Sequence, residues 1–584
     1  MAQRDKIKRA ARPPLVKLER RRDRRAAAGL VLIIAAAFVA YFPSLRGGFI
    51  LDDDMLLTAN RLIQAPDGLY RIWFTTEPID YWPIFNTTFW LQWRLWGMQP
   101  TGYHVTNLAL HVGAALLIWT ILARLLIPGA FLAGLLFAVH PVNVESVAWI
   151  SQCKSVLALF FFLLAIFLYL KAEGTTPVRN AARWYWSSLA AFVLAMLSKG
   201  SVAILPVVLL GLVLWTRPLT SRDLMRTAPF WAVAIVLVLV NVWFQKHGMH
   251  VEFRDVGTVE RLLGAAAAIW FYLFKAILPL DLNFIYPQWD VRASELIWWL
   301  PLLAAVAVTV VLWWFRTRWG RPLLFAWGYF GATLIPVLGF TDVAFMEHSL
   351  VADHYQHVAL IAVTTLVAAG WSVWQRRAGG YVPTVMAASL VAVLTMLTWR
   401  QNSLYADAMT LYQATLTKNP NSWLAHGNLG GVLSEARRFP EAIEHYEQAL
   451  RLHADFPDAR SNFCSTLRDT GRFAEAIGHC REALRLRPDF PEAHNNLGNA
   501  LRDSGQLEEA IEQYRQAVQQ APDYSVAHQN LGTALAESGQ LPEGIAHLQE
   551  AIRLNPTYAD AQHNLRVALS LQQKATERQP SADR

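Results

Sequence analysis

The sequence predicts an all-α protein in two parts, a polytopic helical membrane domain over residues 27–400 and a helical solenoid over residues 421–572. Hydrophobic residues make up 54% of the 584 residues and charged residues only 16%, against about 25% in a typical soluble domain. An asparagine also recurs at intervals of 34 residues, at Asn428, Asn462, Asn496, Asn530 and Asn564. Such a period is typical of a solenoid of paired helices.

The chain starts with a basic tail, residues 1–26, which carries the whole net charge of +8. Because the remainder is neutral overall, this charge does not indicate a nucleic-acid partner. The first apolar run, residues 27–45, lacks a small-residue cleavage site and is predicted to be an uncleaved membrane helix. Its basic flank then stays in the cytoplasm by the positive-inside rule.

About eleven apolar segments are long enough to cross a bilayer, which needs roughly 20 apolar residues per helix. The expected spans are residues 27–45, 104–124, 129–149, 155–171, 184–198, 201–216, 228–244, 294–315, 322–340, 355–374 and 381–398. With the N-terminus inside, the basic loops all fall on the cytoplasmic side, and the solenoid lies on the opposite side. Residues 261–280 break this alternation and are interpreted as a re-entrant or interfacial segment.

The repeats after residue 420 each contain two stretches of apolar and small residues at helical spacing. Gly471, Gly505 and Gly539 are placed to end the first helix of their repeats. The pattern resembles the tetratricopeptide repeat (TPR), with four good repeats over residues 421–557. Residues 401–420 are expected to form the helix of a degenerate repeat, residues 558–571 a closing helix, and residues 573–584 a disordered tail.

The chain has only three cysteines, which indicates no disulfide stapling. Cys464 stands where other repeats have Gly430, Gly498 and Gly532, and Cys480 stands where they have Tyr446 and Tyr514. Both are interpreted as ordinary packing residues. The sequence has no phosphate-cradling glycine loop, nucleophile elbow or zinc-finger spacing.

Three adjacent carboxylates, Asp52, Asp53 and Asp54, follow the first span. They are expected to face water at the outer surface, because an Asp costs about 2.5–3.5 kcal/mol at the centre of a membrane helix. One of them has the properties of a general base that takes a proton from an acceptor hydroxyl. A solvated cluster at a helix end is the alternative interpretation, and the residue chemistry alone does not separate the two.

Longer stretches carry a resemblance to a known family. They include YWPIFNTTFWLQWRLWGMQPTGYHVTNLALH from Tyr81, AVHPVNVESVAWISQCKSVLALFF from Ala138, LSKGSVAILP from Leu197 and FMEHSLVADHYQHVAL from Phe345. Together with the carboxylates and the repeats, the chain resembles bacterial relatives of the transmembrane-and-TPR protein O-mannosyltransferases, which are C-type glycosyltransferases. The resemblance covers nearly the whole chain beyond the basic tail.

This resemblance implies roles for individual residues. Asp52 and Asp53 match the catalytic pair, with Asp52 as the base, and Glu145 matches a second acid. Lys154 and Lys199 match lysines that bind the donor phosphate, although snorkelling to lipid headgroups is the alternative for each. The chain departs from its relatives at Gln152, Cys153 and Ser155, which flank Lys154, and at His357, where relatives have Tyr. These departures bear on the identity of the donor.

Further polar residues are candidates for the sugar pocket: Asp54, Tyr81, His104, Asn107, His140, Asp353 and His354. His111 shares a helix face with His104 and Asn107, and a structural role is favoured for it because it lies deeper. No local ligand spacing specifies a metal, so no metal site is predicted and a divalent ion stays open as a cofactor.

The expected function is transfer of mannose or a similar hexose, with inversion, from a polyprenyl-phosphate donor to Ser or Thr hydroxyls of a protein bound by the TPR groove. The expected location is a bacterial inner membrane, with the solenoid in the periplasm. Two alternatives are a glycosyltransferase acting on a lipid or glycan, and a non-enzymatic membrane-anchored TPR scaffold. The sequence does not name the sugar, the acceptor, the length of the lipid chain or the oligomeric state.

Overall fold

The computed structural model describes residues 15–578 except 79, 175–177, 249–255 and 341–343. These residues fold into helices with no β-strand, which confirms the all-α prediction. The chain divides into two compact units, residues 1–414 and 415–584. Unit 1 contains every candidate site residue, and unit 2 contains the repeats.

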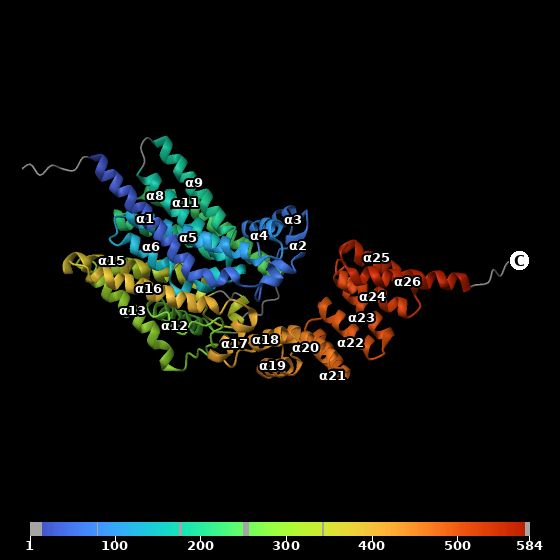
Figure 1. The fold of residues 1–584 in the computed structure, drawn as a ribbon. Helices are drawn as coiled ribbons and strands as arrows, with labels where there is room; N and C mark the ends of the chain where they lie inside the picture. The colour runs from blue at the N-terminus through green and yellow to red at the C-terminus, as the bar shows by residue number, and fades with distance from the viewer. Residues whose placement is uncertain (1–14, 79, 175–177, 249–255, 341–343, 579–584) are drawn as a thin grey trace, which may run out of the picture. The chain divides into compact units, whose positions relative to one another are not determined.

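The first half of unit 1 is built around α5, a long helix that packs against α1, α6 and α8. Three short helices, α2 to α4, gather at the end of the bundle where α1 finishes (Figure 1). The bounds are α1 Leu15–Tyr41, α2 Arg61–Gln64, α3 Gly68–Phe74, α4 Pro83–Trp96, α5 Pro100–Arg124, α6 Ala130–Ala138, α7 Val144–Ala148, α8 Cys153–Glu173, α9 Val178–Met196 and α10 Leu205–Thr216.

The second half of unit 1 returns along the bundle, so that α15 packs against α6 and α16 packs against α1. The region predicted as re-entrant or interfacial forms one unbroken helix, α12, followed by a non-helical loop over residues 278–295. The bounds are α11 Ser221–Gly248, α12 Thr258–Ile277, α13 Trp299–Trp314, α14 Gly320–Leu334, α15 Leu360–Ala378 and α16 Val382–Ser403.

Six helices among the described residues are long and apolar enough to span a membrane, or seven if the bent pair α6 and α7 counts as one span. Helices occupy all eleven places at which spans are expected. The helices α9, α14 and α15 do not meet the same length and composition requirement, and α10 belongs to a shorter apolar helix. The number of eleven spans is therefore not confirmed. The chain nevertheless carries several apolar membrane helices.

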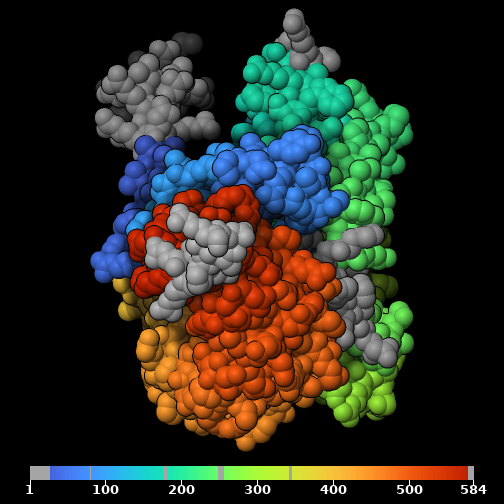
Figure 2. Space-filling model, turned by 90° about the vertical axis from the view of Figure 1, so that its right-hand side faces the viewer, coloured from blue at the N-terminus to red at the C-terminus, as the bar shows by residue number. Residues whose placement is uncertain are grey.

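Unit 2 is a series of helix pairs, and its surface runs in colour order from orange to red in Figure 2. The first helix of each repeat packs on its partner and on the next repeat. The bounds are α17 Ala408–Lys418, α18 Trp423–Glu435, α19 Phe439–Leu452, α20 Pro457–Asp469, α21 Phe473–Leu486, α22 Pro491–Asp503, α23 Leu507–Gln520, α24 Ser525–Glu537, α25 Leu541–Leu554 and α26 Ala559–Arg578.

Both ends of the chain are more helical than the sequence indicated. Helix α1 begins at Leu15, inside the segment interpreted as a basic tail. Helix α26 continues to Arg578, so residues 573–578 are helical and not disordered. The remainder of the expected tail, residues 579–584, lies outside the described residues.

The structure contradicts the prediction for the cysteines of the second repeat. Cys464 on α20 and Cys480 on α21 form a disulfide bond, with their Cα atoms 5.5 Å apart. Their separation of 16 residues places them on facing positions of one helix pair. Sequence reasoning assigned each cysteine to its own repeat position but did not consider that the two positions touch.

The turn inside each repeat requires a left-handed residue. Gly471, Gly505 and Gly539 supply it with φ of 79°, 85° and 84°, as predicted, but the first repeat uses Arg437 with φ of 56°. A side chain with a Cβ costs about 1–2 kcal/mol in this conformation.

We therefore expect Arg437→Gly to raise the free energy of unfolding of unit 2 by about 1 kcal/mol. Thermal or urea unfolding of a fragment spanning residues 415–584 measures this. Gly505→Arg is the matched control, because it introduces the same strain in the third repeat and should lower stability by a similar amount. No gain from Arg437→Gly would contradict the strain argument.

Candidate functional site

Asp53 is the buried member of the acidic triplet. Its carboxylate accepts hydrogen bonds from the backbone N–H of Ile50 at 2.9 Å and of Ser151 at 2.8 Å, and from the Ser151 hydroxyl at 2.5 Å. Burial raises the pKa of Asp53 to about 7, against the opposing effect of these hydrogen bonds. These hydrogen bonds join the loop of Asp53 to the loop of Ser151.

Asp52 and Asp54 lie in different surroundings. Asp52 is partly exposed, and burial raises its pKa while nearby Lys154 lowers it. Asp54 is exposed and accepts a hydrogen bond from the Thr58 hydroxyl at 2.6 Å within its own helical turn. Asp52 is thus the carboxylate that lies near a cation, whereas the Asp54 side chain bonds within its own helical turn, and its pocket role stays a prediction.

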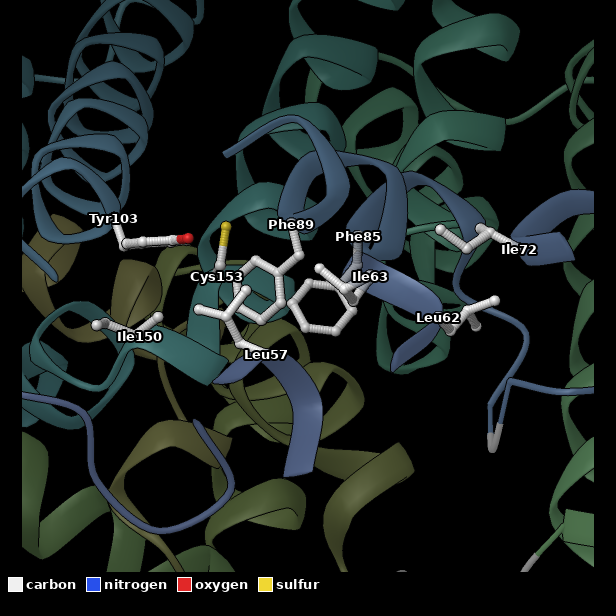
Figure 3. Packing of buried hydrophobic residues seen from close by; sticks show 9 residues of the cluster. All are labelled: Leu57, Leu62, Ile63, Ile72, Phe85, Phe89, Tyr103, Ile150 and Cys153. Carbon is white, nitrogen blue, oxygen red and sulfur yellow. The ribbon is translucent and has the colours of Figure 1, made fainter. Parts of the chain in front are cut away.

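An apolar cluster fixes the triplet beside the start of α8. Leu57, just after the triplet, packs with Phe85 and Phe89 of α4 and with Cys153 of α8 (Figure 3). Lys154 follows Cys153 directly, and its ammonium lies 5.4 Å from the centre of the Trp82 ring. The cluster therefore places Asp52 and Lys154 at the same end of the bundle. Cys153, where the chain departs from its relatives, is one of the buried residues of this cluster.

The second lysine, Lys199, lies between α9 and α10 and donates a hydrogen bond to the Ser155 hydroxyl at 2.8 Å. Ser155 in turn donates to the side-chain oxygen of Gln152 at 2.5 Å. Ser155 and Gln152, two of the departures from the family pattern, thus form a chain of hydrogen bonds that ends at Lys199. Burial, and then the charge of Lys154, lower the pKa of Lys199 to about 7, whereas Glu145 and Asp80 oppose this shift.

Asp80 belongs to the same electrostatic group, although sequence reasoning did not select it. Its carboxylate accepts a hydrogen bond from Gln245 of α11 at 2.9 Å. Burial raises the pKa of Asp80, and the charges of both lysines, Lys154 and Lys199, lower it. The sequence offers one signal for this residue, because Asp80 directly precedes the family-like stretch that begins at Tyr81. Tyr81 itself packs on Phe244, with ring centres 5.1 Å apart.

Glu145 and His354 form a buried pair that joins α7 to the loop before α15. The Glu145 carboxylate lies 2.7 Å from Nδ1 of His354 and accepts a hydrogen bond from its backbone N–H at 3.0 Å. Burial and the two lysines hold the pKa of His354 well below its ordinary value, so the ring stays neutral near pH 7. The lysine Lys199 is close enough to Glu145 for each to influence the other.

Asp353 lies beside this pair but is held by the Tyr286 hydroxyl, which donates to its carboxylate at 3.1 and 3.2 Å. His357, where relatives have Tyr, is buried, and its Nδ1 atom lies 2.8 Å from the backbone oxygen of His354. Both residues thus stabilise the short 3₁₀ turn Asp353–Tyr355 that carries His354.

Two of the predicted pocket residues, Asn107 and His140, hydrogen-bond to the scaffold, and a third, His104, is buried without a hydrogen-bond partner for its ring nitrogens among the described residues. The Asn107 amide lies within hydrogen-bonding distance of the backbone oxygens of Val147, Trp149 and Ile150. One ring nitrogen of His140 lies within hydrogen-bonding distance of the backbone oxygen of Ala276, and the other accepts a hydrogen bond from the backbone N–H of Val142. His104 is buried beside the backbone of Gly47.

His111 lies 3.0 Å from the backbone oxygen of Ala138, which agrees with the structural role favoured for it. Asn107, His140 and His111 therefore hold the loop between α6 and α8, and the pocket role predicted for the first two stays a prediction. Among the described residues, no group of three or more His, Cys, Asp or Glu side chains is arranged to hold a metal ion.

Comparisons with known proteins agree with this division of the chain. Tetratricopeptide repeat families match residues 399–459, 465–525 and 501–569. The Protein O-mannosyl-transferase F38B6.6 of Caenorhabditis elegans is 23% identical over 454 residues, which cover 73% of this chain and 63% of that protein. The human Protein O-mannosyl-transferase TMTC1 is 24% identical over 493 residues, covering 73% of this chain and 55% of that protein.

The chain is a homologue of the TMTC-family protein O-mannosyl-transferases. It spans about half the length of the curated relatives that it matches. Homology to this TMTC family includes the membrane unit, because a match over 73% of the chain exceeds the share of the repeats. A solved TPR protein, YrrB, described as having an unusual peptide-binding site, is 23% identical over 32% of this chain and 91% of its own, with a TM-score of 0.24.

Proposed function

We propose that this protein transfers mannose or a similar hexose, with inversion, from a polyprenyl-phosphate donor to Ser or Thr hydroxyls of a protein. The observation that carries the proposal is the grouping of a partly exposed carboxylate, Asp52, with two cations, Lys154 and Lys199, at one end of the bundle. A base and a phosphate-binding pair are the two elements that displacement of a phosphate by a hydroxyl requires.

In the proposed reaction, the acceptor hydroxyl attacks the anomeric carbon while Asp52 removes its proton. The bond from that carbon to the phosphate oxygen breaks, and its electron pair leaves with the polyprenyl phosphate. Lys154 and Lys199 stabilise the negative charge that develops on the departing oxygen. Asp53 holds the loop of Asp52 against Ser151, so that the base is positioned before the substrate binds.

An apolar cavity supports a donor with a lipid tail. Its volume is about 550 Å³, and apolar side chains such as Leu163 of α8 and Leu212 of α10 line it. The cavity lies towards the ends of these helices that are far from Lys154 and Lys199, since Leu125, Trp215 and Trp319 also line it. A donor with its phosphate at the lysines would place the far part of its hydrocarbon chain there. Pockets of about 300–1,000 Å³ are the usual size for ligands.

The outer face of the membrane is the proposed site of transfer. With the basic tail in the cytoplasm, the loops with Arg217, Arg226 and Arg321 also fall inside, whereas the end of the bundle with Asp52 falls outside. The repeats are the part proposed to hold the acceptor, because helical solenoids present an extended surface for peptide binding. A TPR array favours a protein acceptor over a lipid or glycan.

The purified chain in lipid nanodiscs tests this function directly. Polyprenyl-phosphate mannose labelled in the sugar, supplied with an unfractionated set of secreted proteins, should yield labelled protein from which mild alkali releases the sugar. A nucleotide-linked mannose in place of the lipid donor should yield none. Label that enters lipid or glycan only, or that comes from the nucleotide sugar, would overturn the proposed donor and acceptor.

The pH dependence of donor binding follows from Lys199. Its pKa of about 7 means that the ammonium is lost as pH rises above 7, whereas the phosphodiester of the donor keeps its charge. We expect the dissociation constant for the donor to increase by up to about tenfold per pH unit above 7.

Equilibrium binding of a non-transferable donor analogue between pH 6 and 9 measures this effect. Lys199→Arg is the matched control, because an Arg side chain stays charged over this range and should flatten the profile. The argument fails if the profile is the same for both proteins, or if binding of the wild-type protein strengthens as pH rises.

A further inference from the structure

The second repeat differs from the others at the contact between its two helices. In the first and third repeats, Gly430 and Gly498 face the rings of Tyr446 and Tyr514, and a Cβ on either glycine would lie under 3.0 Å from the ring. In the fourth, Gly532 faces Leu548 in the same way. The small and the large residue therefore fit together as a pair. The second repeat places Cys464 and Cys480 at these positions.

Two cysteine side chains do not replace this pair by packing alone. A thiol in place of the tyrosine ring leaves most of the ring volume unfilled, and such a loss in a core costs stability. Both cysteines are fully buried, and their bonded sulfurs connect α20 directly to α21. The covalent bond thus supplies the contact that the ring supplies elsewhere.

We propose that Cys464 and Cys480 are an oxidative modification site whose disulfide replaces the small-to-large helix contact of the other repeats, so that the solenoid matures only in an oxidising compartment. Disulfides persist in such compartments and are rare in reducing ones. This inference does not depend on catalysis by unit 1. It provides evidence on the location of the repeats that is independent of the basic loops.

The bond forms by exchange with a protein disulfide of the thiol-oxidase class. The thiolate of one cysteine attacks the oxidant's disulfide to give a mixed disulfide and one free thiol on the oxidant. The thiolate of the second cysteine then attacks its partner's sulfur, which closes the intramolecular bond and releases the oxidant as a dithiol. The two electrons lost by the cysteines reside on the oxidant, and the two thiol protons pass to its sulfurs through solvent.

Burial fixes when this exchange occurs. Because neither cysteine is exposed in the folded repeat, an oxidant protein reaches them only before α20 and α21 close on each other. The bond is therefore acquired during folding, and the native solenoid does not cycle between two redox states.

Trapping of free thiols in the full-length chain tests the proposal. Cells are quenched in acid, and the denatured protein is treated with a maleimide that adds mass to each free thiol. Wild type should take up one label, on the unpaired Cys153, and three after reduction. Cys464→Ser should take up two labels without reduction, because Cys480 loses its partner. Three labels on unreduced wild type, or one on Cys464→Ser, would overturn the assignment.

A double variant, Cys464→Gly with Cys480→Tyr, tests the replacement of one contact by the other. It restores the pair found in the first and third repeats. Reductant should speed proteolysis of the wild-type repeats by roughly a hundredfold, from the effect of closing a loop of about 15 residues. The double variant should be insensitive to reductant and as resistant as oxidised wild type. Equal resistance of reduced and oxidised wild type would show that the bond stabilises nothing.

Discussion

Replacement of Asp52 by Asn is expected to lower sugar transfer by about 10²–10⁴-fold while the protein still folds and inserts. The amide keeps the size of the carboxylate but cannot accept the proton of the attacking hydroxyl. Asp52 is partly exposed and stands beside Lys154, whereas the hydrogen bonds that hold this loop converge on Asp53. Initial rates with labelled donor and a saturating peptide acceptor measure the loss.

The neighbouring carboxylates are the matched controls. Asp54→Asn should retain a rate near that of wild type, because Asp54 is exposed and bonded only to its own turn through Thr58. Asp53→Asn should lower thermal stability, since an amide group would face the N–H and hydroxyl donors of Ser151. Activity of Asp52→Asn within about threefold of wild type would show that another group is the base.

Deletion of residues 421–584 is expected to abolish transfer to protein acceptors at low concentration, by about 10²-fold or more, and to spare donor binding. The candidate acids and lysines all lie in unit 1, which has its own core. The repeats would act by holding the acceptor near the site, which raises its effective concentration. Transfer to a short peptide should therefore fall much less than transfer to the full acceptor.

The experiment compares both proteins with both acceptors and adds donor binding as a third measurement. High concentrations of acceptor protein should rescue the truncated chain only partly, because binding energy away from the reacting groups also contributes to turnover. Equal loss on both acceptors, together with loss of donor binding, would show that the repeats support the active site itself and do not recruit the acceptor.

The fold was largely predictable because its signals are local. The 34-residue period fixed the repeats, and the turn glycines Gly471, Gly505 and Gly539 have the positive φ that the pattern predicts. Apolar length located the helices of unit 1. Helix ends were less predictable, as at Leu15 and Arg578, because charged residues at the ends of the chain also favour helix and carry no stop signal.

The site was predictable only in part. Asp52 and Lys154 follow from the family resemblance, and the structure places them together. The pocket role of His140 and Asn107 stays a prediction, and the structure adds that both side chains lie at hydrogen-bonding distance from backbone oxygens of neighbouring segments. A polar residue on an apolar helix reads the same in sequence whether it faces a substrate or another helix.

The sequence by itself determined that this chain has a helical membrane domain and a TPR solenoid, because periodicity and apolar length are properties of consecutive residues. Only the tertiary structure decided which of the three carboxylates is buried, that Asp80 lies near both lysines, and that Cys464 meets Cys480. These facts depend on contacts between residues far apart in the chain, or on facing helices. Burial and distance there set the charge of a side chain and the bonds that it can form.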